Sequence, residues 1–472
     1  MEASQDHQTG WTATSWDGKP APFPRPLKLR AAYLLYQIAI HLLIPVLLVR
    51  LFRLARREPL YRKHISHRLG FGSASQKGPL WIFAASLGET RAASPLIRKL
   101  LEQGETLLLT HSSAAGLKAG QDLFSDEIAQ GHIIQRYQPI DALLPLWLFL
   151  WRYRPVAGLV VECELWPGLM FEPRRFSIPM IAINGSYTER AQARDKDRFW
   201  GLRLALWCGF SRVTTKSRAH AERYETAGIR SEHIATPGEL KFDLPLNALL
   251  KTAGQKARRD YDSLSKGRGV VMFASSIEGE EAQLFDVISR LHETCSLPPL
   301  VLWVPRSPQR FDAVAQASQK HGFRTARRSK DFSGLSPKLD VDCDVLVGDS
   351  IGEMDFYYAF ADVVFVGATL FPMGGHNPIE PLAHEKPVVT GPSIYGVAFP
   401  AFQARDRGAL RVFEDGEALA VGLSTLFQSS EELAAFADQA KGFNAHHKGA
   451  SARTVELLAP VLKRRSTPGA EQ

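Results

Sequence analysis

Short apolar runs alternate with amphipathic stretches along most of the chain after Pro79. Each run has the length of a buried strand and is followed by a segment with helical periodicity. This alternation is typical of repeated βαβ units, and it predicts an α/β protein with parallel, doubly wound sheets. The expected strands are 80–84, 106–110, 157–161 and 179–184 in a first group, and 270–274, 300–304, 344–348, 363–367 and 387–391 in a second group.

A stretch rich in Gly, Pro, Lys and Arg, from Pro237 to Gly269, separates the two groups of strands. The chain of 472 residues is long enough for two or three packed domains, and the stretch favours two. We expect a first Rossmann-like domain over 56–240 and a second over 241–465. Because ligands of doubly wound sheets bind beyond the carboxyl ends of the strands, the turns there should face one shared cleft. Three of these turns read as Ser-x-x-Glu helix starts: Ser86 to Glu89, Ser275 to Glu278 and Ser350 to Glu353.

A longer apolar run, residues 31–49, is interrupted only by Gln37, His41 and Pro45. About 19 residues come close to the length needed to cross a bilayer. The basic residues that follow at once are Arg50, Arg53, Arg56, Arg57, Arg62, Lys63 and Arg68. This pattern predicts a membrane-anchor helix over 31–55, with the large C-terminal body in the cytoplasm; a buried helix of the body is the alternative. Residues 1–30 lack periodicity and are predicted to be a flexible tail.

The charge and the cysteine content of the chain limit which ligands and partners we expect it to bind. A net charge of +8 and a pI near 9.2 suit a nucleic acid, a phospholipid surface or a phosphorylated substrate. The arginines concentrate beside the apolar run instead of forming an aromatic-interleaved basic motif, so we expect no nucleic-acid partner. The four cysteines lie far apart without a CxxC pair, which argues against a zinc module and against a disulfide-stapled secreted fold. Asp342-Cys343-Asp344 has no further ligands nearby, so we expect no metal.

One short segment, Gly374-Gly375-His376-Asn377-Pro378-Ile379-Glu380-Pro381, combines a glycine turn, a helix cap and a carboxylate. The two glycines allow close approach of the backbone, Asn377 can cap a helix, and Pro378 suits its first position. Glu380 stands where it could act as a reciprocal cap or contact a ligand. One interpretation is a grip for an anion and a ribose at the helix N-terminus. A plain capped helix start is the other.

Three further charged positions follow expected strands. Glu89 lies at a strand-to-helix turn, where it could take a proton from an incoming hydroxyl, although a capping-box glutamate is the alternative. Glu162 and Glu164 flank Cys163 just after the strand that ends near Val161. Arg306 could neutralise a phosphate by a bidentate contact, or it could be an ordinary surface arginine.

Taken together, these segments resemble the Kdo transferases, which are membrane-associated glycosyltransferases that attach 3-deoxy-D-manno-octulosonic acid (Kdo) from CMP-Kdo to lipid A precursors. The similarity spans nearly the whole chain after Arg30. In chain order it is carried by Arg57-Glu58-Pro59-Leu60-Tyr61-Arg62, Ala85-Ser86-Leu87-Gly88-Glu89, Tyr137-Gln138-Pro139-Ile140-Asp141, Glu162-Cys163-Glu164-Leu165-Trp166-Pro167, Gly238-Glu239-Leu240-Lys241-Phe242-Asp243, Glu278-Gly279-Glu280-Glu281, Pro305-Arg306, Gly348-Asp349-Ser350-Ile351-Gly352-Glu353 and the Gly374 to Pro381 segment.

The resemblance implies a GT-B architecture, with two Rossmann-like domains facing a cleft. The N-terminal domain would bind a lipid A precursor, the C-terminal domain would bind the CMP-sugar, and the body would lie at the cytoplasmic face of the inner membrane. Glu89 would be the general base for inverting attack. Arg306 and Asn377 would steady the CMP phosphate, and Glu380 would hold the ribose. The matching motifs add Gly352, Gly374 and Gly375 as donor-binding residues and Ser86, Gly88, Glu162 and Glu164 as acceptor-binding residues. No metal or other cofactor is implied.

This chain departs from the family pattern at several positions. The family usually has histidine where this chain has Phe83, Ile277 and Ser307, and asparagine where it has Gly168 and Glu239. Because Glu89, Arg306 and Glu380 are kept, the reaction class is predicted to be retained while the donor or acceptor differs. The alternative is a divergent, non-catalytic membrane-bound paralogue that binds a CMP-sugar or a lipid.

Overall fold

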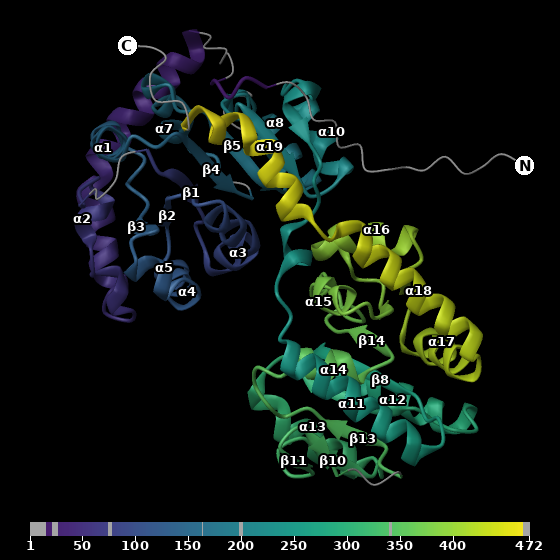
Figure 1. Ribbon diagram of the computed structural model, residues 1–472. Coiled ribbons are helices and arrows are strands. Elements are labelled where there is room, and N and C mark those ends of the chain that lie inside the picture. Colours follow the sequence, from purple (N-terminus) through teal and green to yellow (C-terminus); the bar gives the residue numbers. More distant parts are fainter. Residues whose placement is uncertain are drawn as a thin grey trace, which may run out of the picture. The chain divides into compact units, whose positions relative to one another are not determined.

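The computed structural model describes residues 16–20, 27–73, 78–162, 164–197, 202–338 and 342–465. The chain divides into two compact units: unit 1 holds Met1–Leu244 and Gly449–Gln472, and unit 2 holds Pro245–Lys448. Each unit is built on a parallel sheet whose strands are connected largely by helices (Figure 1). The two-domain α/β architecture expected from the alternation of apolar runs is therefore confirmed.

The sheet of unit 1 has the strand order β3-β2-β1-β4-β5-β6-β7 within the described residues. Its strands are β1 (Leu80–Phe83), β2 (Leu107–His111), β3 (Ile133–Tyr137), β4 (Ala157–Val161), β5 (Met180–Gly185), β6 (Arg212–Thr215) and β7 (Ile234–Ala235). Trp81 of β1 pairs in parallel register with Leu108 on one side and Gly158 on the other. The order of strands therefore reverses between β1 and β4, and ligands of doubly wound sheets bind at the carboxyl ends beside such a reversal.

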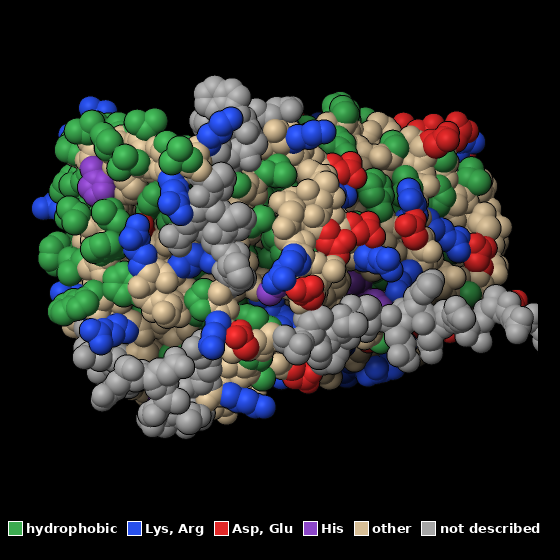
Figure 2. All heavy atoms as spheres, turned by 90° about the horizontal axis from the view of Figure 1, so that it is seen from above, with side chains coloured by type: hydrophobic (Ala, Val, Ile, Leu, Met, Phe, Trp, Pro, Cys, Tyr) green, Lys and Arg blue, Asp and Glu red, His purple; other side chains and the backbone are tan. Residues whose placement is uncertain are grey.

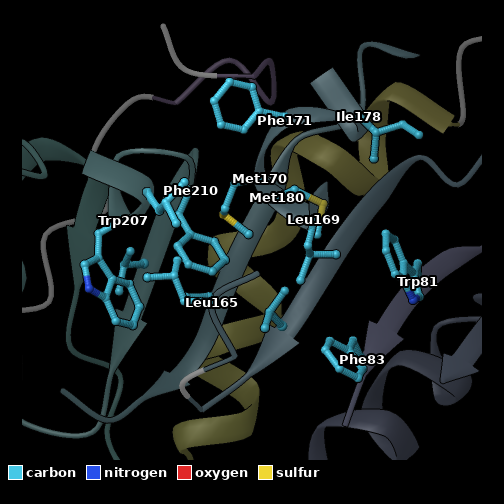
Figure 3. Packing of buried hydrophobic residues seen from close by; sticks show 14 of the residues in the cluster. Trp81, Phe83, Leu165, Leu169, Met170, Phe171, Ile178, Met180, Trp207 and Phe210 are labelled. Atoms are coloured by element: carbon cyan, nitrogen blue, oxygen red, sulfur yellow. The ribbon is translucent and has the colours of Figure 1, made fainter. Parts of the chain in front are cut away.

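The helices of unit 1 cover a sheet that is buried on both sides. They are α1 (Leu27–Leu54), α2 (Ile65–Arg68), α3 (Leu87–Glu102), α4 (Ala114–Leu123), α5 (Ser125–Ala129), α6 (Leu143–Tyr153), α7 (Pro167–Phe171), α8 (Glu189–Asp197), α9 (Leu202–Trp207), α10 (Arg218–Thr226) and α19 (Ala450–Arg465), with 3₁₀ turns η1 (Pro59–Tyr61), η2 (Pro173–Phe176), η4 (Ser231–His233) and η5 (Leu240–Asp243). Trp81 and Phe83 belong to one apolar cluster, with Met170 and Trp207 (Figure 3), whereas Leu80 and Ile82 belong to another. Alternate residues of β1 thus serve opposite faces, as expected for a strand.

The C-terminal helix α19 belongs to unit 1, which corrects the expected second domain over 241–465. Both oxygens of the Asp243 carboxylate accept hydrogen bonds at its start, from the backbone N–H of Gly449 at 2.7 Å and of Ser451 at 2.6 Å. Leu458 and Val461 are buried in the cluster that also holds α3 side chains. Figure 1 shows this helix in yellow among the teal and blue elements of unit 1. The chain therefore returns to its first unit after completing the second.

The expected tail over 1–30 also differs where the structure describes it. Trp16 is buried in the second cluster of unit 1, and the guanidinium of Arg212 lies 5.9 Å from its ring centroid. Helix α1 begins at Leu27, four residues before the expected start, because Leu27 to Arg30 contain no helix breaker. Residues 1–15 and 21–26 lie outside the described residues.

Unit 2 contains a second parallel sheet, with the order β10-β13-β9-β8-β14-β15-β16. Its strands are β8 (Val270–Ser276), β9 (Leu300–Pro305), β10 (Thr325–Arg327), β13 (Val345–Val347), β14 (Val363–Val366), β15 (Val388–Thr390) and β16 (Leu410–Val412), beside a hairpin of β11 (Phe332–Ser333) and β12 (Ser336–Pro337). Its helices are α11 (Ala248–Ser265), α12 (Glu281–Thr294), α13 (Phe311–Lys320), α14 (Met354–Phe360), α15 (Ile379–Ala383), α16 (Ala398–Asp406), α17 (Gly416–Gln428) and α18 (Ser430–His447), with 3₁₀ turns η6 (Pro308–Arg310) and η7 (Tyr395–Val397). Here the order reverses between β8 and β14.

Two of the three expected capping boxes do not form. Only Ser86 caps its helix as predicted, accepting from the backbone N–H of Glu89. After Ser275 and Ser350 the helices begin later, at Glu281 and Met354. The reason is a glycine at each motif: Gly279 directly follows Glu278, and Gly352 directly precedes Glu353. Their positive φ values of 94° and 84° cannot continue a right-handed helix.

Candidate active site

The carboxylate of Glu89 is held at the carboxyl end of β1 by two hydrogen bonds from neighbouring residues. The backbone N–H of Ala85 donates to Oε2 at 2.6 Å, and the hydroxyl of Ser86 donates to Oε1 at 3.1 Å. The same hydroxyl accepts from the backbone N–H of Glu89 at 3.3 Å, so a capping box closes the N-terminus of α3. Glu89 itself is half-buried. The side chain therefore has a fixed position.

Burial, together with the negative charges of Glu164 and Glu162, raises the pKa of Glu89 to about 7, although the hydrogen bonds from Ala85 and Ser86 act in the opposite direction. A carboxylate with this pKa is part ionised at neutral pH and binds a proton more readily than an ordinary glutamate. Those are the properties of an effective general base. Glu162 and Glu164 follow β4, the strand that pairs with β1, so the structure brings the three expected carboxylates to one edge of the sheet.

A buried ionic network supports this edge, and its lysine was not expected from the sequence. Lys216, after β6, pairs with Glu162 at 2.9 Å and with Glu239 at 3.1 Å, and Lys241 lies 3.5 Å from Glu162. Asn184, near the end of β5, donates to Glu239 at 2.9 Å. Burial raises the pKa of Glu162, but the charges of Lys216 and Lys241 outweigh burial and lower it. Glu162 thus stays charged near Glu89. A single lysine after a strand has no local signal that marks such a role.

The remaining acceptor-side residues differ in what they contribute. Gly88 is exposed, and a Cβ there would meet only the Ser86 hydroxyl, at 3.9 Å, so its absence leaves open space beside the base. Glu164 accepts a hydrogen bond from the Trp166 indole at 2.6 Å. At Gly168 a Cβ would lie 2.8 Å from Asp141 Oδ1, and the Gly168 N–H donates to that carboxylate at 2.7 Å. Asparagine, usual in the family at Gly168, therefore has no room here.

Unit 2 contains a pocket with a volume of about 450 Å³ at the carboxyl ends of its strands. Its walls come from the turns after β8, β9, β13 and β14 and from the start of α15. The lining residues are Ala274, Ser275, Val304, Pro305, Arg306, Pro308, Phe311, Ser350, Ile351, Gly352, Met354, Tyr358, Val366, His376, Asn377 and Glu380. Four of the expected donor residues, Arg306, Gly352, Asn377 and Glu380, are thus brought together.

The polar groups of this pocket leave capacity for a ligand. Arg306 is exposed and forms no ion pair with any residue that the structure describes. Glu380 accepts from the buried Tyr358 hydroxyl at 3.2 Å, which fixes one carboxylate oxygen. The Nε2 atom of His376 is buried and has no hydrogen-bond partner in the described part of the chain, and burial together with the charge of Arg306 lowers the pKa of its ring. One cation, one carboxylate and one neutral imidazole therefore face the same space.

The glycine turn before α15 shapes the pocket instead of lining it. Gly374 and Gly375 have φ values of 91° and 81°, and Gly374 N donates to the Ser393 hydroxyl at 2.9 Å. Asn377 Oδ1 accepts from Ile379 N at 3.0 Å, so Asn377 caps the turn as expected, although Pro378 precedes the first helical residue. Helix α15 has only five residues. Its dipole is correspondingly small, and the expected anion contact at this helix start stays a prediction.

Glu280 is the functional-site residue that sequence reasoning missed in unit 2. Its fully buried carboxylate accepts from the backbone N–H groups of Ala368, Thr369 and Leu370 at 2.8–2.9 Å. These residues follow β14 and lead into the glycine turn. Glu280 therefore holds the loop that carries His376 and Asn377. The Glu278-Gly279-Glu280-Glu281 motif was visible in the sequence, but a partner 88 to 90 residues away was not.

Two parallel sheets, each with candidate site residues at the carboxyl ends of its strands, define the class: a glycosyltransferase of GT-B fold. Residues 63–244 match a family model described as 3-deoxy-D-manno-octulosonic-acid transferase (kdotransferase). The chain is 35% identical to the 3-deoxy-D-manno-octulosonic acid transferase of Bordetella pertussis over 90% of this chain and 99% of that protein. It is 30% identical to the 3-deoxy-D-manno-octulosonic acid transferase of Haemophilus influenzae, over 89% of this chain and 96% of that protein. The chain belongs to the 3-deoxy-D-manno-octulosonic acid transferase family.

Among solved structures, a glycosyltransferase from Rickettsia africae is similar over 82% of this chain and 99% of its own, with a TM-score of 0.53 and 12% sequence identity. Similarity at this level of identity concerns the fold alone. It agrees with the GT-B architecture that the two sheets show.

Proposed function

We propose that this protein transfers Kdo, or a closely related acidic sugar, from a CMP-sugar to a lipid A precursor in lipopolysaccharide biosynthesis, with inversion at the anomeric carbon. The observation that carries the proposal is the Glu89 carboxylate, fixed by Ala85 and Ser86 at the edge of the first sheet and poised to accept a proton near neutral pH. Family membership supports the choice of sugar.

In the proposed reaction, Glu89 removes the proton from an acceptor hydroxyl as the oxygen attacks the anomeric carbon of the donor. A carbon–oxygen bond forms, the bond between that carbon and the CMP phosphate oxygen breaks, and CMP leaves with the bonding electrons. The proton on Glu89 then passes to solvent. Single-step displacement of this kind needs one base and gives inversion. Ser86 positions the carboxylate, and burial, with the charges of Glu164 and Glu162, keeps its pKa high.

The pocket of unit 2 is proposed to hold the CMP part of the donor. Arg306 has no carboxylate partner among the residues that the structure describes, so its guanidinium is free to pair with the phosphate, whose negative charge grows as CMP departs. Glu380, held by Tyr358, has a second oxygen available to accept hydrogen bonds from ribose hydroxyls. Asn377 and Gly352 line the same space. Transfer requires the acceptor bound by unit 1 to reach the donor bound by unit 2 during turnover.

Membrane attachment fits a lipid acceptor. Helix α1 has the length and composition of a membrane segment, and basic residues follow it directly. Basic residues beside an apolar segment are attracted to the anionic lipids of a cytoplasmic leaflet. We therefore propose that the protein works at the cytoplasmic face of the inner membrane.

The test is acceptor-dependent release of CMP by purified full-length protein. With CMP-Kdo and a lipid A precursor, the wild-type protein should release CMP and the Glu89→Gln variant should release at least 100-fold less, because only the base is lost. The variant should still bind CMP, which separates loss of chemistry from loss of the donor site. If wild-type protein binds CMP but no CMP-sugar turns over with any lipid acceptor, the chain is a binding paralogue and the proposal is wrong.

A further inference from the structure

Helix α1 presents a continuous apolar row on one side. The row consists of Leu34, Leu35, Ile38, Leu42, Leu43, Val46, Val49 and Phe52, whose side chains are between 48% and 74% exposed. Exposed large apolar residues are costly in water when they are contiguous, so a row of this length marks a contact surface.

The opposite side of α1 is fixed to unit 1 by polar side chains. The Tyr33 hydroxyl donates to Glu172 Oε1 at 2.6 Å, and the Tyr36 hydroxyl donates to Asp141 Oδ2 at 3.0 Å. The side chain of Gln37 is buried, and its carbonyl oxygen accepts from the backbone N–H of Leu143 at 2.8 Å. Buried polar groups are costly unless they keep their partners. These contacts therefore hold the N-terminal half of α1 against the protein.

The shielded side continues along the helix. Less exposed positions recur every third or fourth residue, at 29, 32, 33, 36, 37, 40, 41, 44, 47, 48 and 51. The chain that leaves α1 is also attached to unit 1, because the Tyr137 hydroxyl donates to the Leu60 carbonyl at 2.9 Å and Ile140 N donates to the Arg68 carbonyl at 2.8 Å. The N-terminal half of α1 and the chain that follows the helix are thus tied to the same compact unit.

These attachments are incompatible with a helix that crosses the bilayer. From Tyr33 to Leu54 the helix rises by about 32 Å, close to the thickness of the hydrocarbon core. A crossing helix would place Tyr33 and the residues after Leu54 at opposite surfaces, and it would draw the Asp141 and Glu172 carboxylates into the hydrocarbon. Ionisable groups are strongly disfavoured there. A helix that lies along unit 1 avoids both penalties.

Helix α6 extends the same surface. Its exposed residues Leu144, Trp147 and Trp151 recur at helical spacing, on one side. The two helices are neighbours, because buried Glu172 accepts from the Tyr33 hydroxyl of α1 with one oxygen and from the Trp147 indole of α6 with the other. Tryptophan is enriched where a bilayer meets water. The spacing and the residue types indicate a surface that enters the lipid interface.

Charge around this surface suits anionic lipid. Arg50, Arg53, Arg56, Arg57, Arg62 and Lys63 are exposed, and none of them forms an ion pair with a residue in the described ranges. Figure 2 shows hydrophobic side chains gathered at the side of unit 1 where α1 lies, with Lys and Arg side chains around them. Basic residues beside an apolar surface are attracted to the anionic headgroups of such a membrane.

We propose that α1 does not cross the bilayer but lies in the plane of its interface, and that α6 enters the same interface, so that both helices form one lipid-binding surface. The partner is a bilayer that contains anionic phospholipid. This inference does not depend on the proposed transferase activity. If that activity holds, the position of the proposed base matters, because hydrogen bonds connect Glu89 to Arg68. The Arg68 guanidinium donates to the Ser112 carbonyl at 2.6 Å, the Ser112 N–H donates to the Ala85 carbonyl at 3.0 Å, and the Ala85 N–H donates to the Glu89 carboxylate. The base is thus connected to α2, the helix that follows α1 in the chain.

Depth measurements on the full-length chain distinguish the two orientations. A fluorophore is attached to a cysteine introduced as Leu35→Cys, Leu42→Cys or Val49→Cys, in a chain whose own cysteines are serine, and is quenched by brominated lipids in phosphatidylcholine–phosphatidylglycerol vesicles. Spaced by seven residues, these positions share the exposed side of α1. The inference expects equal, shallow depths. A crossing helix would place residue 42 about 10 Å deeper than the other two, and this result would overturn the inference.

The contribution of α6 is tested by vesicle binding. Trp151→Ser should weaken binding about tenfold through the loss of apolar burial, with α1 unchanged. Val421→Ser is the matched control, since it removes an equally exposed apolar side chain that belongs to unit 2 and to neither helix of this surface, and it should leave binding unchanged. Because Trp151 is exposed, unchanged circular dichroism will show that the variant folds. Wild-type affinity in Trp151→Ser would show that α1 alone carries attachment.

Discussion

At the scale of single residues, Glu89 shows that a capping role and a proposed catalytic role are compatible. The sequence leaves the two as alternatives. In the structure the hydroxyl of Ser86 and the amide of Ala85 hold the carboxylate at the helix start, and this rigid placement is what a general base needs. Burial and the nearby charges of Glu164 and Glu162 then set its proton affinity. The cap provides the position, and the surroundings provide the pKa.

A pH profile checks this assignment. Because the pKa of Glu89 is raised to about 7 and the base acts when ionised, kcat/KM should rise tenfold per pH unit below pH 7 and level off above it. In Glu164→Gln, the loss of one negative charge should lower the pKa of Glu89, so the acid limb should move to lower pH. Steady-state CMP release across pH 5 to 9 measures both. An acid limb that stays in place in this variant would contradict the electrostatic coupling.

Arg306 gives a second prediction at this scale. Replacing Arg306 with alanine removes the cation proposed to face the CMP phosphate, and charge-assisted contacts of this kind are worth about 1.5–3 kcal/mol. Calorimetric titration with CMP should therefore show an affinity roughly 10- to 100-fold lower. Arg290→Ala is the control, since Arg290 is also in unit 2 but pairs with Glu417 at 2.7 Å. Equal affinities of the two variants would remove Arg306 from the donor site.

At the scale of elements, the loop after β14 depends on one carboxylate from another strand connection. Glu280 gathers the amides of Ala368, Thr369 and Leu370, and the glycine turn with His376 and Asn377 follows from there. Three backbone N–H groups that donate to one buried carboxylate hold the loop strongly, because charge-assisted hydrogen bonds are stronger in a low-dielectric surrounding. The pocket shape is thus set by a residue that does not line it.

Replacing Glu280 with glutamine tests whether these hydrogen bonds hold the loop after β14. The new NH₂ group cannot accept from the backbone amides, so at least one buried donor should be left unpaired, which costs about 1–3 kcal/mol. Urea unfolding should show unit 2 less stable by this amount, and CMP affinity should fall because the loop moves. Glu278→Gln, two residues away and exposed, should change neither. Identical unfolding of both variants would show that the loop does not rely on Glu280.

At the scale of the whole molecule, the chain leaves unit 1 at Leu244 and returns at Gly449. Asp243, just before unit 2, accepts hydrogen bonds from the backbone N–H groups of Gly449 and Ser451, just after unit 2. Unit 1 therefore cannot complete its fold until unit 2 has been synthesised, since α19 supplies buried Leu458 and Val461 to its core.

Leu458→Ala measures what the returning helix contributes. Deleting a fully buried leucine typically costs about 2–5 kcal/mol, and the loss should fall on unit 1 alone. Scanning calorimetry with and without CMP assigns the transitions, because a ligand of unit 2 raises the melting temperature of unit 2. The variant should lower the CMP-insensitive transition and leave CMP affinity unchanged. A drop in the CMP-sensitive transition would place α19 with the other unit.

The sequence predicts a strand well where its residues are all apolar, and poorly where the strand contains a polar residue whose hydrogen-bond partner is elsewhere in the chain. The expected strands at 80–84, 157–161, 270–274 and 300–304 are confirmed by β1, β4, β8 and β9. By contrast, β3 and β6 were not expected, because Arg136 and Arg212 break their apolar pattern. Arg136 is accommodated by hydrogen bonds to the Tyr153 hydroxyl and to Ser73, which are distant in sequence. No local rule contains those partners.

The order of apolar runs and motifs, by itself, determined the α/β class, the family resemblance and the segments from which Glu89 and the donor-pocket residues come. These properties are local, because a buried strand and a glycine turn are written in neighbouring residues. Only the tertiary structure decided that α19 completes unit 1, that Lys216 and Glu280 support the two sites, and that the polar side of α1 faces unit 1. Each of these depends on hydrogen bonds or ion pairs between residues more than 50 positions apart. Such contacts stabilise the folded protein, but they produce no periodic pattern of apolar and polar residues in the sequence.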